Sequence, residues 1–374
     1  MTPHAHLVAG MAYGDEGKGS IVDFLVRRHH ASLVVRYNGG SQCAHNVITP
    51  DRRHHTFAQF GAGSFVPGVR THLSQYMLIN PLNMMCEEEH LREVGVSDIW
   101  DRTTVHAKAL IITPYQKAVN RVLEMSRGQA KHGSCGQGIG ITREHYLIHR
   151  DKVIFAGDLK SESTTKEKLE FIRKLCRDQI SRLGHKADRT ESSIIWSDAT
   201  NWLWEQYKHW PAKIVNSFAD EIDGVEHMVF EGAQGVLLDE IYGVPPYNTW
   251  TDTTFNNAVS LLSGVGFNGK KTKIGVVRTY YTRHGAGPFE TEVNWMCLPE
   301  PHNATNKYQD NFRQGLFDMK KFEYAMKAVG GVDYVALNHN DVTGSYYLDK
   351  IKSFAPIGIW GYGPSSLEKS WTEE

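Results

Sequence analysis

The sequence predicts an α/β fold with a mostly parallel central sheet flanked by helices. Two observations indicate this. Residues 4–46 read as a strand, a glycine-rich loop, an amphipathic helix and a second strand, which is how a βαβ unit begins. Apolar runs at residues 228–230, 273–280 and 332–337 are each followed by a polar or glycine-containing motif. Because open α/β sheets bind ligands at the carboxyl ends of their strands, we expect one binding cleft there.

The first loop predicts a P-loop-like nucleotide-binding fold. We expect a strand at residues 7–9, the loop at 10–19, a helix at 20–29 and a strand at 32–37. Glycine-rich backbone at a helix N-terminus suits an anion, and Lys18 adds a cation. The strict GxxxxGK[ST] pattern is missed, because residue 12 is Ala and residue 19 is Gly. Asp15 and Glu16 beside a phosphate would need a metal ion or a proton-transfer role, the alternative being a tight turn with a solvated lysine.

The remaining elements follow from periodicity and stop signals. We expect a helix from residue 81 to 94, ended by Gly95, with residues 87–89 facing solvent. Residues 105–112 are strand-like and lead into a polar, mobile-looking stretch. Residues 164–184 and 194–210 predict two amphipathic helices, a helical excursion from the α/β core without chemistry of its own. Since no repeat or linker interrupts the pattern, we expect one domain over residues 1–374.

Composition limits the partners. The formal net charge is −1 with both signs mixed, which favours small-molecule substrates over a nucleic acid polymer or a membrane. Five widely spaced cysteines without a CxxC pair indicate neither a disulfide framework nor a zinc site. The adjacent histidine pairs at 29–30 and 54–55 predict surface residues rather than metal ligands. We therefore expect a cytoplasmic protein, in the host cytoplasm if the chain is viral.

Six motifs in order then carry a family resemblance. They are GDEGKG at 14–19 followed by IVD at 21–23, GGSQCAHN at 39–46, GSCGQGIG at 133–140, FEGAQG at 230–235 with LLD at 237–239, TR at 282–283 with GAGPF at 285–289, and GP at 363–364. Together they resemble the adenylosuccinate synthetase family over nearly the whole chain. The resemblance implies an enzyme that joins L-aspartate to C6 of a purine nucleotide through a 6-phosphoryl intermediate, using Mg²⁺ and a nucleoside triphosphate. It also implies a homodimer.

The resemblance assigns roles to individual residues. Asp15 would be the base for the purine N1 proton and a metal ligand together with the Ala44 carbonyl, although a helix N-cap is the bland alternative for Asp15. His45 would donate toward the transferring phosphoryl group, and Gln234 would orient the 6-oxygen. Further expected contacts are Gly14, Glu16, Gly17, Lys18, Gly19, Asn338, Asp341, Gly363 and Pro364 for the triphosphate, Ser41, Gln42, Ser134, Cys135, Arg150, Leu238, Thr249 and His284 for the purine monophosphate, and Thr305 and Arg313 for aspartate. Arg150 is expected to reach the nucleotide of the other subunit.

Departures from the family pattern narrow the substrate. The family's guanine-reading TKLD is NHND at 338–341, which favours ATP as donor over GTP and leaves dATP open. GSQCAHN and SCGQGIG resemble the viral branch of 2-aminoadenylosuccinate synthases, which implies dGMP as the acceptor, on the route to 2-aminoadenine DNA. Its 2-amino group needs an acceptor, which Ser41 or Gln42 could supply. The alternatives are an ordinary adenylosuccinate synthetase acting on IMP with GTP, and a binding module that has lost catalysis.

Overall fold

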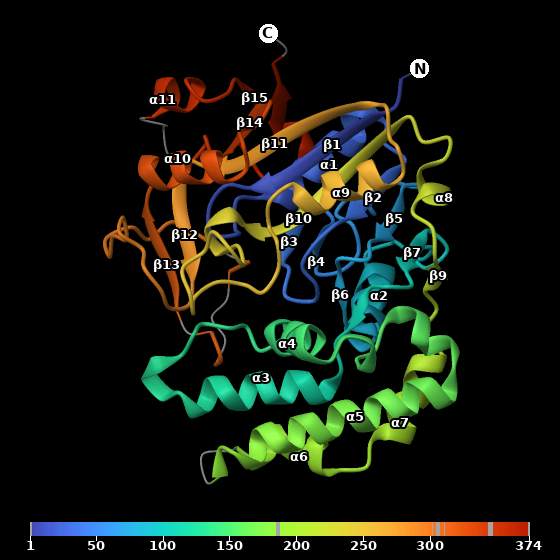
Figure 1. The fold of residues 1–374 in the computed structure, drawn as a ribbon. Coiled ribbons are helices and arrows are strands. Elements are labelled where there is room, and N and C mark those ends of the chain that lie inside the picture. Colours follow the sequence, from blue (N-terminus) through green and yellow to red (C-terminus); the bar gives the residue numbers. More distant parts are fainter. Residues whose placement is uncertain are drawn as a thin grey trace.

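A ten-stranded sheet runs through the protein, confirming the predicted α/β class (Figure 1). The computed structural model describes residues 2–184, 188–300, 302–303, 307–309, 311–342 and 347–372. The strand order is β16-β15-β14-β11-β1-β10-β2-β5-β7-β9, and every neighbouring pair is parallel except β15 and β16. The strands are β1 (His4–Gly10), β2 (Leu33–Arg36), β5 (Arg70–Leu73), β7 (Thr103–His106), β9 (Lys213–Val215), β10 (His227–Gly235), β11 (Lys270–Arg278), β14 (Tyr334–Asn338), β15 (Ile357–Gly361) and β16 (Lys369–Trp371).

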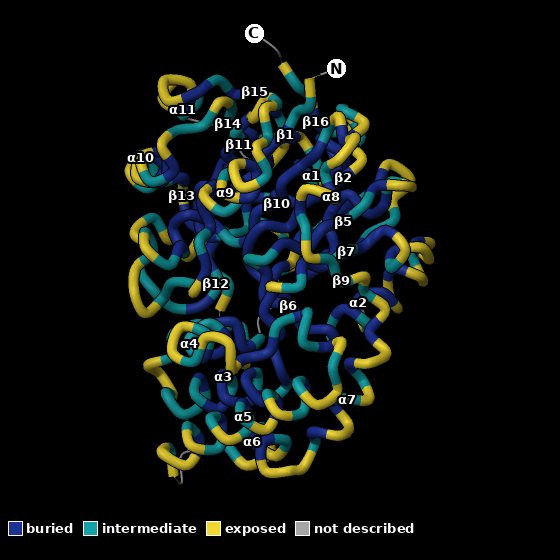
Figure 2. Tube along the Cα trace, turned by 45° about the vertical axis from the view of Figure 1, so that its right-hand side comes forward, coloured by how far each residue is buried: buried dark blue, intermediate teal, exposed yellow. Residues whose placement is uncertain are grey.

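The sheet is buried on both faces, as its continuous apolar strands predict. Alternate residues enter two separate cores: Val8 and Val229 join one, and Leu7 and Phe230 join the other. The first core packs against α1 (Lys18–His29), and the second against α9 (Asn256–Gly264), α10 (Met319–Ala328) and α11 (Leu348–Lys352). Figure 2 shows buried residues along the strands and exposed ones mainly on outer helices and loops.

A helical layer lies beyond one edge of the sheet, at the bottom of Figure 1, as the predicted excursion requires. It contains α3 (Pro114–Ser126), α4 (Ile139–His149), α5 (Glu162–Ser181), α6 (Arg189–Trp196) and α7 (Thr200–Lys208). The prediction of one helix at 194–210 was wrong, because α6 and α7 are separate. The Ser197 hydroxyl donates to the Ile194 carbonyl at 2.9 Å, which occupies a helical acceptor and ends α6.

Within the described residues, three two-stranded ribbons and two further α-helices accompany these elements. The ribbons are β3 (His45–Ile48) with β4 (His54–Phe57), β6 (Leu78–Ile79) with β8 (Leu110–Ile111), and β12 (Tyr280–His284) with β13 (Phe312–Leu316); the helices are α2 (Pro81–Glu93) and α8 (Ala219–Ile222). The strand predicted at 105–112 is split into β7 and β8, since Ala109 N donates to His106 O and closes a turn between them. The stretch predicted to be mobile is helix α3, which a Thr113–Gln116 capping box starts.

Several polar side chains predicted at the surface are buried. Glu87 accepts hydrogen bonds from the backbone of Ala58 and Gln59, both at 2.9 Å, so it faces inward from α2. His55 is only 2% exposed and lies 2.8 Å from His90 between ring nitrogens, so the surface prediction was wrong for His55. None of the helices in the described ranges is long and apolar enough to cross a membrane.

Candidate active site

A cleft of about 1270 Å³ brings together most of the predicted site residues from segments far apart in the sequence. It lies between the loops at the carboxyl ends of β1 and β10 and the helical layer. The predicted residues that line it are Gly14, Asp15, Ser41, Gln42, Ala44, His45, Ser134, Cys135, Gln234, Leu238, Thr249 and His284. The expected position at the carboxyl ends of the strands is therefore met.

The loop after β1 supplies its own anion. Glu16 Oε1 accepts the backbone N–H groups of Ala12 at 2.9 Å and Gly14 at 2.8 Å, and Glu16 Oε2 lies 2.7 Å from Lys18 Nζ. Glu16 and Lys18 are each 1% exposed. The carboxylate thus occupies the position between backbone amides and lysine that a phosphate takes in a P-loop. Neither side chain lines the cleft, in contrast to the predicted triphosphate contacts.

Asp15 lies within this loop and lines the cleft. Its Oδ2 accepts no hydrogen bond among the described residues, although His284 Nε2 is 3.3 Å away. Burial raises the pKa of Asp15 above its ordinary value, against the opposing charge of His284. Asp15 is not the N-cap of α1, because Gly17, in the left-handed region (φ 87°), occupies that position. The arrangement gives a half-buried carboxylate that is a stronger base than a solvated one.

His45 is held by a buried carboxylate that we did not single out from the sequence. Its Nδ1 lies 2.5 Å from Glu231 Oε1, while Glu231 Oε2 accepts the Ala62 N–H at 2.8 Å. Burial raises the pKa of Glu231, but the charge of Arg36 and the hydrogen bond to His45 outweigh this effect and hold it below its ordinary value. Burial lowers the pKa of His45 to about 4, against the raising effect of Glu231. A glutamate inside an apolar strand was the available sequence signal.

Gln234 is fixed by its backbone. It has φ 61°, a left-handed conformation uncommon for a residue with a side chain, at the end of β10. Asn38 clamps the preceding residue: its Oδ1 accepts the Ala233 N–H at 2.7 Å and its Nδ2 donates to the Ala233 carbonyl at 3.0 Å. Because such conformations cluster at functional sites, this geometry supports a positioned amide at Gln234.

The loop after β2 presents unpaired polar atoms to the cleft. Ser41 Oγ and both amide atoms of Gln42 are buried without a hydrogen-bond partner in the described part of the chain. Opposite them, Ser134 Oγ donates to Asn120 Oδ1 at 3.0 Å, and burial raises the pKa of Cys135 to about 11, so its thiol stays protonated. Buried polar groups are normally paired, so Ser41 and Gln42 are open to a ligand.

Predicted donor-nucleotide residues lie outside this cleft, near the ends of β14 and β15. Asn338 is 4% exposed and its Nδ2 donates to the Glu16 carbonyl at 2.8 Å, so it supports the loop after β1. Lys369 Nζ donates to the carbonyls of Gly363 at 3.1 Å and Pro364 at 3.3 Å, and burial lowers its pKa to about 8. Asp341 is exposed. Of these residues, only Asp341 and Pro364 present exposed surface, whereas Asn338 acts within the protein.

The remaining predicted contacts that fall within the described residues do not line the cleft. Arg313 pairs with Glu292 at 2.8 Å and donates to the Gly287 carbonyl at 3.0 Å, so its guanidinium is already engaged. Arg150 follows α4, lies over the Tyr146 ring and does not line the cleft of its own chain. Thr305 is outside the described residues. Gly17 and Gly19 pack under Asn338 and His45, where a Cβ would meet atoms at 2.7 and 2.8 Å.

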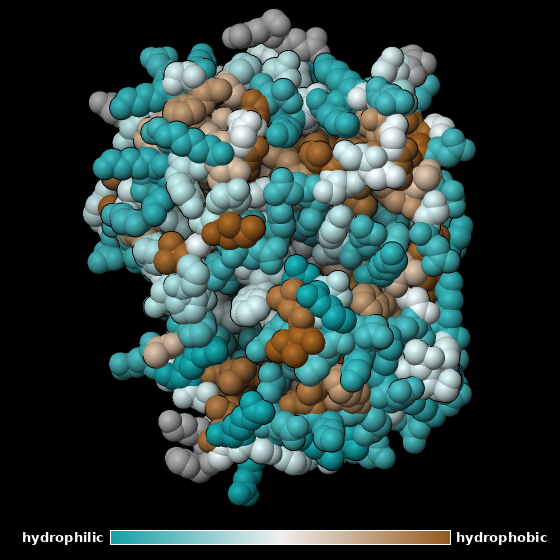
Figure 3. Space-filling model, viewed as in Figure 1, coloured by the Kyte–Doolittle hydropathy of each residue, from teal (hydrophilic) through white to brown (hydrophobic). Residues whose placement is uncertain are grey.

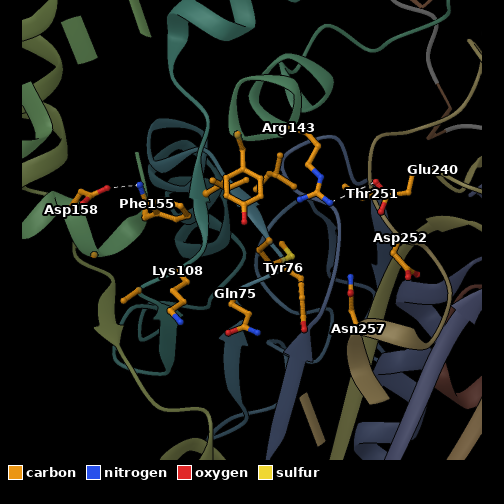
Figure 4. A pocket seen from close by; sticks show the side chains of 16 residues that line it. Gln75, Tyr76, Lys108, Arg143, Phe155, Asp158, Glu240, Thr251, Asp252 and Asn257 are labelled. Atoms are coloured by element: carbon orange, nitrogen blue, oxygen red, sulfur yellow. Dashed lines mark hydrogen bonds and ion pairs between the residues drawn. The ribbon is translucent and has the colours of Figure 1, made fainter. Parts of the chain in front are cut away.

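A second pocket of about 610 Å³ adjoins the cleft and shares Glu240 with it (Figure 4). Figure 4 shows Arg143 reaching toward Glu240 on one side, with the aromatic rings of Tyr76 and Phe155 on the pocket wall. The Arg143 and Glu240 charges are 3.8 Å apart. No residue that we predicted for the site lines this pocket.

Comparisons with known proteins find relatives along nearly the whole chain. The family model described as adenylosuccinate synthetase matches residues 7–354. The adenylosuccinate synthetase of Lactobacillus helveticus is 30% identical over 372 residues, covering 97% of this chain and 83% of that protein. That of Anaeromyxobacter sp. strain K is 28% identical, covering 92% and 79%.

Two solved structures share the fold. The fully ligated adenylosuccinate synthetase of Plasmodium falciparum aligns with a TM-score of 0.77 at 20% identity, covering 98% of this chain and 99% of that one. The succinoaminodeoxyadenylate synthetase (PurZ) of cyanophage S-2L, bound to dGMP and to dATP as an energy donor, aligns with a TM-score of 0.73 at 18% identity, covering 100% and 97%.

Proposed function

The chain belongs to the adenylosuccinate synthetase family, ligases that join aspartate to a purine nucleotide, and we propose that its acceptor is dGMP and its donor ATP. The products would be N6-succino-2-amino-2′-deoxyadenylate, ADP and phosphate, on the route to 2-aminoadenine DNA. dATP is a second candidate donor, because the cyanophage enzyme with the same fold was solved with it.

The choice of acceptor rests on the buried polar atoms of Ser41 and Gln42 that have no hydrogen-bond partner among the described residues. The 2-amino group of guanine is a donor that IMP lacks. Ser41 Oγ and Gln42 Oε1 are acceptors without a partner in the described structure, in the same cleft as Asp15. An acceptor that stays buried and unpaired when IMP binds would cost about 1–3 kcal/mol, which gives discrimination in favour of dGMP.

Activation of the 6-oxygen requires a base and an orienting donor. Asp15, with its raised pKa, would take the N1 proton as the 6-oxygen attacks the γ-phosphorus and ADP leaves. Gln234 would donate its amide N–H to the 6-oxygen, where negative charge develops. In the second step the free amine of aspartate would attack C6, the C6–O bond would break to release phosphate, and the nitrogen would give up one proton to the departing phosphate.

His45 would stabilise the transferring phosphoryl group. In the ligand-free protein its pKa is about 4, so the ring is neutral, and its Nδ1 faces Glu231. A phosphoryl anion near Nε2 would favour a second proton on the ring, and Glu231 would balance the resulting charge. Glu231 is therefore a positioning residue that acts through His45.

The donor set near Asp15 fits Mg²⁺. Asp15 Oδ2, which accepts no hydrogen bond among the described residues, and the carbonyl oxygen of Ala44, an exposed residue that lines the cleft, are hard oxygen ligands of the kind Mg²⁺ prefers. Bound there, Mg²⁺ would neutralise charge on the transferring phosphoryl group.

The test is phosphate release with aspartate and Mg²⁺, comparing dGMP, GMP and IMP as acceptors, with ATP, dATP and GTP as donors. The proposal expects turnover on guanine nucleotides with an adenine donor. Turnover on IMP with GTP alone would overturn it and leave an ordinary adenylosuccinate synthetase. Absence of aspartate-dependent phosphate release with every pair would instead indicate a binding module.

A matched pair of variants locates the discrimination. Gln42→Leu should lower kcat/KM for dGMP by about 10- to 100-fold and leave any activity on IMP nearly unchanged, because only dGMP carries the 2-amino donor. Ser134→Ala is the control, since both acceptors carry the same monophosphate and both should lose activity equally. Equal losses in Gln42→Leu would contradict the role given to Gln42.

A further inference from the structure

Three histidines lie together at the amino end of the sheet, at the opposite end of β1 from the cleft. His4 and His6 are two residues apart on β1 and therefore point to the same face. His227 begins β10 and is the register partner of His4. The six residue steps from His4 to Gly10 span about 20 Å, so this cluster is separate from Asp15 and the cleft.

The ring nitrogens of the three histidines lie close together, and several have no hydrogen-bond partner among the described residues. One nitrogen from each of His4, His6 and His227 lies within 4.8 Å of the other two. His6 is 1% exposed, and neither of its ring nitrogens has a hydrogen-bond partner among the described residues. His227 Nδ1 is likewise buried without one, while His4 Nε2 lies 2.8 Å from Thr272 Oγ1.

An imidazole with both nitrogens unsatisfied in a protein interior calls for an explanation, because each such atom costs free energy. Packing accounts for part of it: the His6 ring lies 4.0 Å from His4 and stacks on His29 at 4.3 Å between centroids. Stacking uses the ring faces and leaves the in-plane lone pairs unused. A ligand in the ring planes would use them.

The chemistry of the ligands defines the ion. Imidazole nitrogens suit zinc, copper and nickel, whereas Mg²⁺ and Ca²⁺ prefer oxygen. Zinc–nitrogen distances of about 2.0–2.1 Å place tetrahedral ligands roughly 3.4 Å apart, so rotation about the side-chain torsions would suffice to close the observed spacing. We propose that His4, His6 and His227 bind one divalent transition-metal ion, with Zn²⁺ as the probe, and that it ties β1 to β10.

The experiment uses the full chain without a polyhistidine tag. After chelator treatment and removal of the chelator, the protein is titrated with Zn²⁺ by calorimetry and with Co²⁺ by visible absorption. We expect one equivalent to bind, tetrahedral Co²⁺ bands and a higher melting temperature. Absence of binding to the wild-type chain would overturn the proposal.

Variants assign the site. His6→Asn and the less buried His4→Gln should each weaken Zn²⁺ binding at least about tenfold and abolish the Co²⁺ bands. His72→Asn is the control, because His72 is also buried in the central sheet but lies 2.9 Å from Thr104 Oγ1 through its Nδ1, outside the cluster. Wild-type affinity in both cluster variants, or equal loss in His72→Asn, would contradict the assignment. Far-UV circular dichroism of each variant checks that it folds.

Discussion

The proposed role of Asp15 as a base predicts both the activity of its asparagine variant and the pH dependence of the wild-type enzyme. Asp15→Asn should lower kcat by about 10²- to 10⁴-fold, because it removes the base for N1. In the wild type, the acid limb of kcat/KM should lie above the ordinary aspartate pKa of about 4, since burial raises the pKa of Asp15. Phosphate release across pH 4–9 measures both, with nucleotide binding as the check on folding. An acid limb at or below pH 4 would contradict the assignment.

The raised pKa of Asp15 also predicts how the stability of the folded protein changes with pH. A carboxyl whose pKa is higher in the folded state binds its proton more tightly there, so its contribution to stability declines as pH rises from 3.8 through the folded pKa. Asp15→Asn should therefore melt at a higher temperature than wild type at pH 8, and this gain should vanish below about pH 4. Calorimetric scans at the two pH values test it; an equal gain at both would contradict it.

The contribution of Glu231 to folding stability depends on pH in the opposite direction to that of Asp15. Its pKa is lowered in the folded protein, so it stabilises the fold above pH 4.5 and loses this effect as pH falls through the folded pKa. Glu231→Gln should lower the free energy of unfolding by about 3 kcal/mol at pH 7, because the buried Arg36 loses the carboxylate 3.8 Å away that balances its charge, and the deficit should shrink in acid. Urea unfolding measures it, with the exposed Glu89→Gln as control. A constant deficit from pH 7 to pH 3 would be inconsistent with this role.

The sequence motifs predicted the positions of several side chains in the cleft, but they did not predict the contacts that Glu16 and Lys18 make. Asp15, His45 and Gln234 lie where their motifs predict. Glu16 and Lys18 have equally suggestive types, but they satisfy each other inside the loop. Sequence order cannot show that a carboxylate two residues from a lysine folds back onto it, because this depends on the left-handed turn at Gly17.

At the scale of elements, helix α3 connects folding stability to the cleft. Thr113 caps α3 and is fully buried, and Asn120 on the same helix accepts the N–H of Gly138 at 2.9 Å. Thr113→Ala should cost about 1–2 kcal/mol of unfolding free energy and raise KM for the acceptor nucleotide, since the 133–140 loop loses its support. Ser161→Ala, which removes the cap of α5, should lower stability without changing KM. Equal KM values in the two variants would contradict this link.

The elements that periodicity predicted best are those with one long apolar pattern. The helix at 164–184 and the central strands are confirmed because burial on a continuous face fixes them. The helix at 114–126 was missed although Thr113-Pro114 and Gln116 form a capping signal, because its polar residues obscured the pattern. The split between β7 and β8 depends on one turn from His106 to Ala109, in which His106 Nδ1 accepts the Lys108 N–H at 3.1 Å. The alternation of apolar residues does not reveal this local contact.

At the scale of the whole molecule, the family relationship leads us to expect a homodimer. Figure 3 shows one face with separate hydrophobic patches among hydrophilic residues. Exposed tryptophans include Trp196 on α6 and Trp202 on α7.

Arg150 does not line the cleft of its own chain. If it serves the partner's nucleotide, Asp15→Asn and Arg150→Ala chains should each be inactive alone and recover about a quarter of wild-type activity when mixed equally, since half the dimers then hold one intact site. Light scattering should give twice the mass of one chain. A monomer, or no recovery after mixing, would contradict this expectation.

The Glu16 carboxylate between the amides of Ala12 and Gly14 also affects the dynamics of the empty enzyme. In a loop that binds phosphate directly, the backbone amides gain their acceptor only when the ligand is bound. In this loop the Glu16 carboxylate already accepts their hydrogen bonds. These two amides should therefore exchange their hydrogens for deuterium slowly before any nucleotide is added, and nucleotide should slow them little further. In Glu16→Gln, which replaces the internal anion with a neutral amide, exchange without nucleotide should be faster than in the wild type. The loop after β1 would then hold Asp15 in one position before nucleotide binds, and nucleotide binding would not be needed to order it.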